Sequence, residues 1–257
     1  MPSYPRSASV LQPAGRGEPA RYGDVLWHLY EAPPSRVLDA VLKDPEGALA
    51  SRAQILKSAG ACTVGRLGDL VIKRWQPRGL YDLVKNSLRG SRARRAGLRA
   101  AALEAVGIRT AHVWAWGVRK FWGLPGASYL VMDHIPHQPE FIQSEETRRM
   151  ITRSMGELIG LLHRHGFTHR DLKPTNIVCD EEGRAYLIDL DGLRARRRIS
   201  DRRAVRDLAK LARRMVELSH LLPRQAALFL DVYSRIRGRR TRAWWWKQIV
   251  ARMPAQA

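Results

Sequence analysis

Residues 166–178 read GFTHRDLKPTNIV, a charged stretch set between apolar residues. Phe167 and Thr168 lead into it, and Ile177 and Val178 follow it. A buried strand or helix at this point would have to satisfy several charged side chains at once, and burying an unpaired charge is costly. The stretch therefore predicts either contact with solvent or a chemical task, and the surrounding sequence has to decide between the two.

Length and composition set the outer bounds. The chain has 257 residues, of which 45% are hydrophobic, enough for one large domain or for two lobes that share a cleft. No apolar run approaches the ~18 residues of a membrane span. The first residues have no apolar signal region, and their Pro, Gly, Ser and Arg content predicts a flexible tail over 1–21. The two cysteines, Cys62 and Cys179, fit a reducing compartment and offer no disulfide framework or metal site.

The charge balance points to an anionic partner. The chain carries 45 Lys and Arg against 24 Asp and Glu, a formal net charge of +21. Such an excess suits a nucleic acid, an acidic membrane face or a phosphorylated ligand. An arginine-rich proteome would also raise the count. The clustering into blocks at 89–99, 194–203 and 235–242 favours a partner over that alternative.

The helix with the clearest signals covers 144–166 and ends where the charged stretch begins. Ser144 is a suitable N-cap, and Glu145 and Glu146 follow in the first turn, where the helix dipole favours acids. Apolar residues recur on one face at helical spacing, and Gly166 is a helix terminator. The charged stretch is therefore expected to form a loop.

The remaining elements separate into early strands and late helices. Strands are expected at 53–75 (two strands around a turn at Gly68 and Asp69), 128–135, 176–180 and 184–192. Helices are expected at 91–107 with a Ser91 cap, at 201–218, and over the rest of the chain after 218 except near Gly238. This order predicts an α+β chain of two lobes that join near 133–143.

Residues 169–176, HRDLKPTN, match the pattern H-R-D-x-x-x-x-N, the catalytic loop of protein kinases. The expected context is also present, since a long helix precedes the loop. An apolar strand that ends in acid, LIDLDG at 187–192, follows where kinases carry D-F-G. The chain thus resembles the protein-kinase-like superfamily.

A narrower resemblance is to the lipopolysaccharide kinase (Kdo/WaaP) family of bacteria. The stretches that carry it are ILKSAGACTVGRLGDLVIKRW, SRARRAGLRAAALEAVGIRTAHVWAWG, HGFTHRDLKPTNIV, LIDLDGLR and RAVRDLAKL, which cover most of residues 53–212. The resemblance implies a bilobal protein-kinase-like fold with a β-rich, nucleotide-binding N-lobe over 22–133. The mainly helical C-lobe over 134–257 would hold the catalytic loop and bind the metal and the acceptor. It also implies ATP and Mg²⁺ as cofactors.

Phosphoryl transfer requires an aligned hydroxyl, neutralised phosphates and a bound metal. The motif indicates which residue meets each requirement. Asp171 is the candidate base, and Lys173, on the same side, is the candidate to contact the transferred phosphate. Asn176 and Asp189 are the metal candidates. Asp191 competes with Asp189, because its Asp-Gly pair could imitate the end of D-F-G. Asp189 is preferred because it directly follows the apolar strand.

The nucleotide-binding candidates lie in the first lobe. Lys73, in the β-branched run LVIKRW, resembles the strand lysine that pairs with the α- and β-phosphates; an edge-strand surface lysine is the alternative. Ser58 and Gly60 could cover phosphate with backbone amides, although no G-x-G-x-x-G is present. Met132 is included with this group. The acid that should pair with Lys73 is not identified, since the following helix offers only Glu104, late in its course and not expected to reach the lysine. Either another acid takes its place or the lysine is held differently.

Other conspicuous residues have structural explanations. Trp244, Trp245 and Trp246 could anchor at a membrane interface but are expected to pack in the core of a lobe. Asp207 resembles an acid that braces the catalytic loop from below; a helix-surface carboxylate is the alternative. The histidines lack metal-ligand spacing.

Three functions compete: a small-molecule or glycolipid kinase, a protein kinase, and a non-enzymatic, nucleic-acid-binding pseudokinase. A protein kinase should carry A-P-E after its metal-binding aspartate, and none occurs between Asp189 and Asp207. A pseudokinase would usually have lost one of its catalytic residues, and all are present.

The sequence therefore predicts an ATP-dependent kinase for a sugar hydroxyl, in the inner core of lipopolysaccharide (Kdo or heptose). An aminoglycoside-type kinase is the first alternative, and a serine/threonine kinase and a nucleic-acid-binding pseudokinase are further ones. The expected partners are an anionic glycolipid or sugar and an anionic membrane, with nucleic acid disfavoured. The expected location is the inner face of the cytoplasmic membrane, as a peripheral protein.

Overall fold

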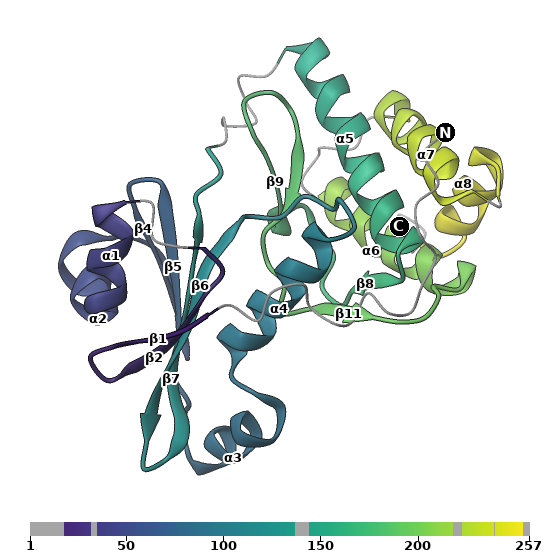
Figure 1. Ribbon diagram of the computed structural model, residues 1–257. Coiled ribbons are helices and arrows are strands. Elements are labelled where there is room, and N and C mark those ends of the chain that lie inside the picture. The colour runs from purple at the N-terminus through teal and green to yellow at the C-terminus, as the bar shows by residue number, and fades with distance from the viewer. Residues whose placement is uncertain (1–17, 32–34, 137–143, 218–222, 239, 254–257) are drawn as a thin grey trace. The chain divides into compact units, whose positions relative to one another are not determined.

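The computed structural model describes residues 18–31, 35–136, 144–217, 223–238 and 240–253. Its contacts divide the chain into two compact units. Unit 1 comprises Met1–Ala105 and Ala111–His134, and unit 2 comprises Val106–Thr110 and Ile135–Ala257. Unit 1 holds an antiparallel sheet and unit 2 is mainly helical, so the predicted α+β class is confirmed (Figure 1).

The sheet of unit 1 has seven strands in the order β1-β2-β6-β7-β5-β4-β3, and every neighbouring pair is antiparallel. The strands are β1 (Glu18–Tyr22), β2 (Val25–Leu29), β3 (Gln54–Ala59), β4 (Cys62–Leu67), β5 (Leu70–Trp75), β6 (Val113–Phe121) and β7 (Leu124–Asp133). The tail expected over 1–21 lies outside the described residues as far as 17. Residues 18–21 do not belong to a tail as predicted, because β1 pairs with β2 and β2 continues the sheet to β6.

The stretch 53–75 contains three strands rather than the predicted two. The turn at Gly68 between β4 and β5 is where the sequence placed it. A second turn at Gly60 separates β3 from β4, and the φ of +59° at this residue lies in the left-handed region that glycine adopts without strain. Gly60 was predicted only as a phosphate-loop candidate, and the strand break at this residue was not predicted.

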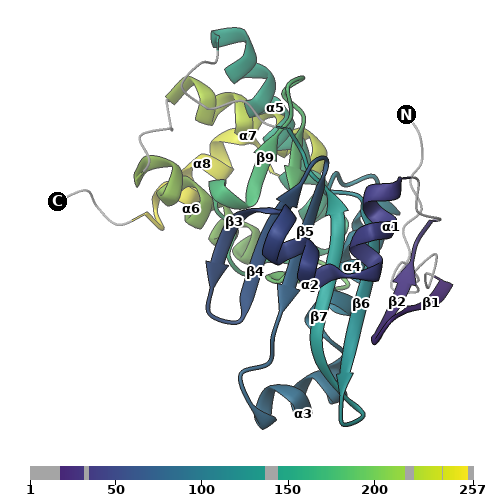
Figure 2. The same cartoon turned by 90° about the vertical axis from the view of Figure 1, so that its left-hand side faces the viewer.

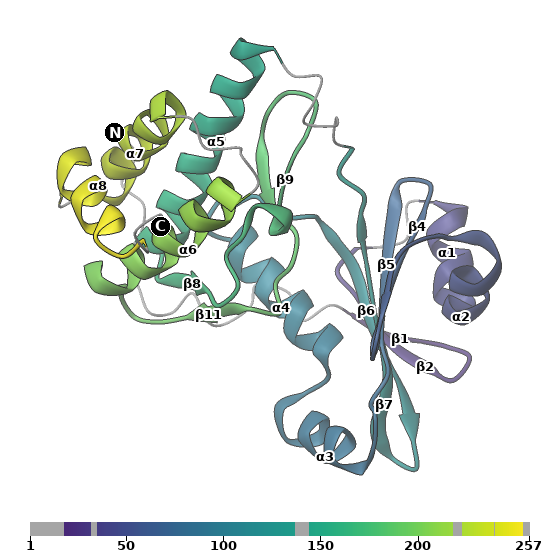
Figure 3. The ribbon, with the colours of Figure 1, turned by 180° about the vertical axis from the view of Figure 1, so that it is seen from behind.

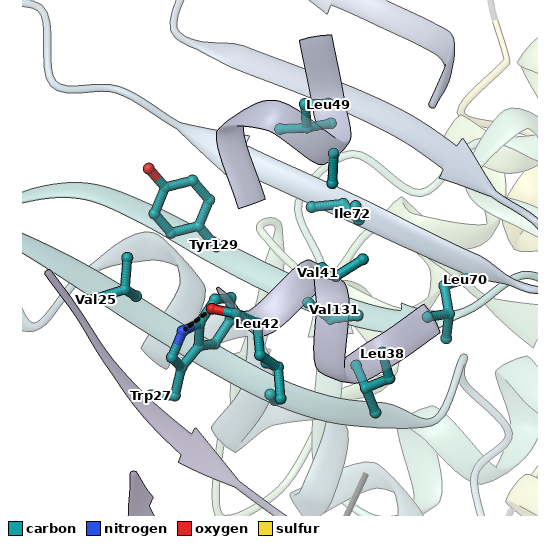
Figure 4. Packing of buried hydrophobic residues seen from close by; sticks show 12 residues of the cluster. Val25, Trp27, Leu38, Val41, Leu42, Leu49, Leu70, Ile72, Tyr129 and Val131 are labelled. Atoms are coloured by element: carbon teal, nitrogen blue, oxygen red, sulfur yellow. Dashed lines mark hydrogen bonds between the residues drawn. The ribbon is translucent and has the colours of Figure 1, made fainter. Parts of the chain in front are cut away.

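One face of the sheet packs on the short helices α1 (Arg36–Lys43) and α2 (Pro45–Gly47) and the π-helical turn η2 (Ala48–Arg52). Figure 4 shows this core, in which Leu70 and Ile72 of β5 and Val131 of β7 surround the helix side chains. The buried indole Nε1 of Trp27 donates to the Leu42 carbonyl at 3.0 Å, which ties β2 to α1. Truncating a buried leucine such as Leu42 to alanine would cost about 2–5 kcal/mol.

The opposite face of the sheet carries α4 (Arg92–Glu104), which contacts β5, β6 and β7. The predicted Ser91 cap is confirmed, since its hydroxyl accepts from the Arg94 backbone N–H at 3.1 Å. The buried stripe of α4 consists of small residues and one leucine: Ala93, Ala96, Gly97, Ala100 and Leu103. A further helix, α3 (Leu80–Arg89), precedes it (Figure 2), and none of its residues is buried.

Unit 2 is built on α5 (Glu145–Arg164), α6 (Asp201–Glu217), α7 (Pro223–Arg237) and α8 (Arg242–Val250), seen from behind in Figure 3. The Ser144 cap is confirmed by a 3.1 Å hydrogen bond from the Thr147 backbone N–H to its hydroxyl. Trp245 is fully buried against the edge of Tyr233, with ring centroids 5.1 Å apart, whereas Trp246 is exposed. The expected core role therefore holds for Trp245 and not for Trp246.

Short strands complete unit 2: β8 (Phe167–His169) pairs with β11 (Leu193–Ala195), and β9 (Ile177–Cys179) pairs with β10 (Ala185–Leu187). The segment Val106–Thr110, which the sequence placed in the first lobe, groups with this unit. The Thr110 hydroxyl donates to the Leu187 carbonyl at 2.7 Å, and the Arg109 guanidinium donates to the Ser154 hydroxyl at 2.9 Å. These bonds attach the segment to β10 and α5.

Candidate active site

The charged stretch of the sequence folds as strand, turn and strand in unit 2. It was expected to be a loop up to the strand predicted at 176–180. Its first residues instead form β8, which is paired with β11 so that His169 lies opposite Leu193. Arg170 to Lys173 follow as a turn, and Pro174–Asn176 form the single 3₁₀ turn η4 before β9. The apolar residues anchor both ends of the segment, and the charged ones lie between the anchors.

Asp171 and Lys173 form an ion pair at the centre of this turn. The Lys173 ammonium lies 2.7 Å from a carboxylate oxygen of Asp171, whose side chain is 61% exposed. The hydrogen bond from Lys173 holds the pKa of the Asp171 carboxyl below its ordinary value. Asp171 is therefore ionised at neutral pH and able to accept a proton or orient a hydroxyl.

Asn176 is buried, and hydrogen bonds of both its side chain and its backbone hold it in place. Its side-chain Nδ2 donates to the Asp171 carbonyl at 2.8 Å, and its own carbonyl accepts from the Ile188 backbone N–H at 3.1 Å. With Nδ2 engaged in this way, the amide oxygen is the end that remains for a ligand. An amide oxygen suits Mg²⁺, which prefers oxygen donors.

Asp189 lies next to Asn176, because the backbone N–H of the preceding residue, Ile188, donates to the Asn176 carbonyl. The buried His169 ring bonds the Asp189 carbonyl through Nε2 at 2.7 Å, and the Asp189 carboxylate accepts from the Asp191 backbone N–H at 3.1 Å. Asp189 is half-buried and Asp191 is exposed. Of the two competing aspartates, Asp189 is thus the one whose backbone and side chain are both fixed beside the loop.

Gly192 allows this arrangement to close. A Cβ added at Gly192 would stand 2.8 Å from the His169 ring, so the chain passes too close to the imidazole for any side chain. The Gly192 carbonyl also accepts from the Arg170 backbone N–H at 2.9 Å. Neither His169 nor Gly192 was assigned a role from the sequence, although both stood inside the quoted motifs.

Helix α6 supports the catalytic turn through Lys210, whose ammonium donates to the Arg170 carbonyl at 3.2 Å. Asp207, the residue predicted to brace the loop, is buried and lies 3.7 Å from the Nε2 of His163 in α5. His163 bonds the Tyr233 hydroxyl at 2.8 Å through Nδ1, and burial lowers the pKa of the imidazole. Lys210 was missed by the sequence analysis; its position three residues after Asp207 was the available signal.

Lys73 occupies the middle of β5 in unit 1, opposite Val64 of β4 and Leu130 of β7. Side chains alternate along a strand, and Ile72 faces α1, so Lys73 belongs to the face covered by α4. Met132 is on the same face, because its neighbour Val131 packs in the α1 core. The structure thus places two nucleotide candidates on one side of the sheet.

Glu104 is the only acid in the sequence of α4, and it is engaged elsewhere. Its carboxylate lies 3.4 Å from the Nδ1 of His112, and burial raises the pKa of the carboxyl. The face of α4 that packs on the sheet carries alanine, glycine and leucine. The acid that kinases place on this helix has no equivalent on the buried stripe of α4.

The turn between β3 and β4 contains the two phosphate-loop candidates. Ser58 lies opposite Thr63, and Gly60 forms the turn. The Arg78 guanidinium occupies the space where a Cβ of Gly60 would stand. The structure therefore adds a cation to this turn that was not predicted from the sequence.

Among the described residues, no group of three or more His, Cys, Asp or Glu forms a candidate metal cluster. The residues that fit a metal are Asn176 and Asp189, one amide and one carboxylate from adjacent segments. Such a sparse protein ligand set is what Mg²⁺ uses when substrate phosphates and water supply the remaining ligands.

A family model described as "Lipopolysaccharide kinase (Kdo/WaaP) family" matches residues 72–233, more than half of the chain. Among solved structures, WaaP in complex with acyl carrier protein is similar with a TM-score of 0.57 and 20% identity, covering 88% of this chain and 98% of that one. The crystal structure of WbdD is similar with a TM-score of 0.51 and 17% identity, covering 79% of this chain and 46% of that one. These likenesses confirm the predicted protein-kinase-like fold.

Curated relatives match only in part. A segment of 51 residues is 35% identical to serine/threonine-protein kinase F of Synechocystis, and one of 61 residues is 33% identical to dual specificity protein kinase zak2 of Dictyostelium discoideum. The matches span 20% and 24% of this chain and a tenth of the length of each of these kinases.

Proposed function

The chain belongs to the lipopolysaccharide kinase (Kdo/WaaP) family, and we propose that it transfers the γ-phosphate of ATP to a sugar hydroxyl of the lipopolysaccharide inner core, on Kdo or heptose. Membership of a kinase family makes it a phosphotransferase that uses ATP. The observation that carries the sugar acceptor is the family match, which runs through Lys73, the catalytic turn and Asp189 without interruption.

The chemistry follows from the residues of unit 2. The acceptor oxygen attacks the γ-phosphorus, the bond from that phosphorus to the oxygen bridging to the β-phosphate breaks, and ADP leaves. Asp171 orients the hydroxyl and takes its proton, for which its ionised state suits it. The Lys173 ammonium, which lies 2.7 Å from the Asp171 carboxylate, balances the negative charge on the transferred phosphate.

Asn176 and Asp189 would hold Mg²⁺, which supplies charge neutralisation of the phosphates when bound. The protein's own contribution is to fix these two residues. The bonds from Ile188 to Asn176 and from His169 to the Asp189 carbonyl prevent either segment from drifting.

Nucleotide binding is assigned to unit 1. Lys73 supplies a cation for the α- and β-phosphates, the turn around Ser58 and Gly60 supplies backbone N–H groups, and Met132 belongs to the same site. Arg78 adds a second cation at Gly60, in place of the amides that a full glycine-rich loop would present.

The basic blocks differ in what they offer to an anionic acceptor. The run at 194–198 is exposed. In the block 235–242, Arg240 lies 3.0 Å from Asp201 and Arg242 lies 3.0 Å from Asp231, so these arginines serve structural ion pairs. We therefore assign recognition of the anionic glycolipid to 194–198 rather than to 235–242.

A location on the inner face of the cytoplasmic membrane follows from the proposed acceptor. No helix in the described part of the chain has the length and hydropathy to cross a bilayer. Attachment would then depend on peripheral contacts, to which each Lys or Arg near an acidic leaflet adds roughly 1 kcal/mol.

The local similarity to protein kinases makes a protein acceptor the second candidate. One panel separates the candidates: ATP consumption by the purified chain with core oligosaccharides, Kdo-lipid A, aminoglycosides and generic protein substrates. We expect turnover with the core sugars. Turnover with protein alone, or with aminoglycosides alone, would overturn the proposal.

A further inference from the structure

Helix α3 of unit 1 is amphipathic, but its polar side faces the unit and its apolar side faces solvent. Its polar side chains Asp82, Lys85 and Asn86 line a small pocket together with Trp75 and Arg95. The helix therefore turns its polar side toward the unit. A helix in a globular protein normally does the opposite, so the exposed side of α3 needs a different explanation.

That exposed side is apolar. Leu80, Tyr81 and Leu88 are 70%, 77% and 82% exposed, and Val84 is exposed as well. At about 100° per residue these four side chains fall within an arc of about 100°, a single apolar stripe. With no residue of α3 buried, the stripe contributes little to the core of unit 1.

The turn between β6 and β7 presents two more exposed aromatic residues. Trp122 is 91% exposed, and Phe121 beside it is also exposed. Trp122 and Gly123 form a two-residue turn in which both have positive φ, 51° and 77°. Such turns favour asparagine, aspartate and glycine, so tryptophan is unfavourable here for the backbone, and its ring is left almost entirely in solvent.

These two features lie together. Helix α3 contacts β7, and in Figures 1, 2 and 3 α3 and the β6–β7 turn are found at the same end of unit 1. We call them the apolar tip, which consists of Leu80, Tyr81, Val84, Leu88, Phe121 and Trp122. Exposed apolar groups of this kind commonly mark an interaction site.

The charges around the apolar tip are basic. Arg89 and Lys120 are exposed, and the Lys85 ammonium lies 5.7 Å from the centre of the Tyr81 ring. Asp82 is the only acid between residues 74 and 99, and β6 and β7 carry none before Asp133. The partner is therefore expected to be both apolar and anionic.

We propose that the apolar tip inserts into the interfacial layer of an anionic bilayer and is the membrane-docking surface of this protein. Segments that lie in a membrane interface typically combine Leu, Tyr, Phe and Trp with neighbouring Lys and Arg. The high exposure of each apolar side chain suits a fluid layer that can surround it from every direction. The inference rests on the proposed function in one respect, because a membrane-bound glycolipid acceptor is what would bring the protein to a bilayer.

The test is co-sedimentation of the full chain with phosphatidylglycerol vesicles and with phosphatidylcholine vesicles, at low and high salt. We expect binding to the anionic vesicles, part of which survives high salt because apolar insertion is not screened. The variant Trp122→Gly relieves the backbone and so keeps the fold, and Leu88→Ser changes an exposed position. Each should lower the vesicle partition coefficient roughly tenfold, the equivalent of one lost apolar anchor.

The matched control is Val37→Ser, which removes an exposed apolar side chain of α1 and should leave binding unchanged. Equal binding by the tip variants and the wild type would overturn the inference. The inference would also be overturned if the wild-type chain did not bind vesicles but bound an acidic protein, such as acyl carrier protein, through Trp122. Phosphorylation of a soluble core sugar, measured on the same variants, reports on the proposed function separately and should not change.

Discussion

The catalytic turn of unit 2 and the strand-lysine region of unit 1 are built in different ways. In unit 2, Asp171, Asn176 and Asp189 are joined by hydrogen bonds between short segments, each at 3.1 Å or less. In unit 1, α4 covers the sheet with alanine and glycine, and Glu104 is engaged with His112. One region is a tight polar network, and the other is an apolar packing surface that carries a lysine.

The two regions therefore differ in how much of the chemistry is encoded locally in the sequence. The residues proposed for proton and metal handling lie within 169–192 and depend on one another's positions. The residues proposed for the nucleotide are scattered over 58–132 and depend on the sheet. Substitutions in the first set should therefore affect turnover most, and those in the second set should separate binding from chemistry.

The largest effect is expected for Asp171→Asn. The change removes the proton acceptor and keeps the shape of the side chain, so turnover should fall by roughly 10²–10⁴-fold. Thermal stability and ATP binding should stay near wild type. Turnover within a factor of two of wild type would show that the polar network of unit 2 does not carry the chemistry.

The next comparison is inside that network. Asp189→Ala should weaken Mg²⁺-dependent ATP turnover by roughly 10²-fold, the scale at which loss of a charge-stabilising group acts. Asp191→Ala removes an exposed carboxylate and should have a much smaller effect. Titration of turnover with Mg²⁺ checks the ranking, and the reverse order would assign the metal to Asp191.

The substitutions Lys73→Ala and Glu104→Gln test the strand-lysine region of unit 1. Loss of the lysine should raise the KM for ATP and lower kcat, together by roughly tenfold or more, because one phosphate cation is removed. Glu104→Gln should change neither constant by more than about twofold, since that carboxylate pairs with His112. An equal loss in both variants would mean that Glu104 supports the lysine after all.

The smallest effect is a shift in pH dependence on Lys173→Met. Lys173 lowers the pKa of Asp171 in the wild type, so Asp171 stays ionised down to lower pH than an isolated aspartate. Removing the ammonium lets that pKa rise, and the acidic limb of the kcat/KM profile should move to higher pH. An unchanged limb, with activity otherwise lowered, would show that Lys173 acts only on the phosphate.

Local signals predicted the long elements of the fold but not the short ones. Ser144 and Ser91 marked the starts of α5 and α4, because capping is a contact within one turn. The helices between 36 and 52 were missed, since their stability comes from contacts such as that between Trp27 and Leu42, fifteen residues apart. Arg109 was placed in the wrong unit for the same reason, because its partner Ser154 is 45 residues away.

The same division holds at the site. The motif at 169–176 named the proposed catalytic and metal residues, because their spacing is itself the signal. The sequence could not reveal that His169 holds the Asp189 carbonyl, that Gly192 makes room for the ring, or that Lys210 reaches Arg170 across forty residues. Those contacts exist only after β8, β11 and α6 have packed.

The central claim is that the catalytic turn of unit 2 phosphorylates a sugar. The most direct measurement is a competition in one vessel, in which the wild-type chain, ATP and Mg²⁺ are incubated with dephosphorylated inner-core oligosaccharide and a generic protein substrate, and the products are weighed by mass spectrometry. We expect the mass of one added phosphate on the oligosaccharide, no change in the protein, and loss of the product with Asp171→Asn. Phosphate on the protein with none on the sugar would contradict it.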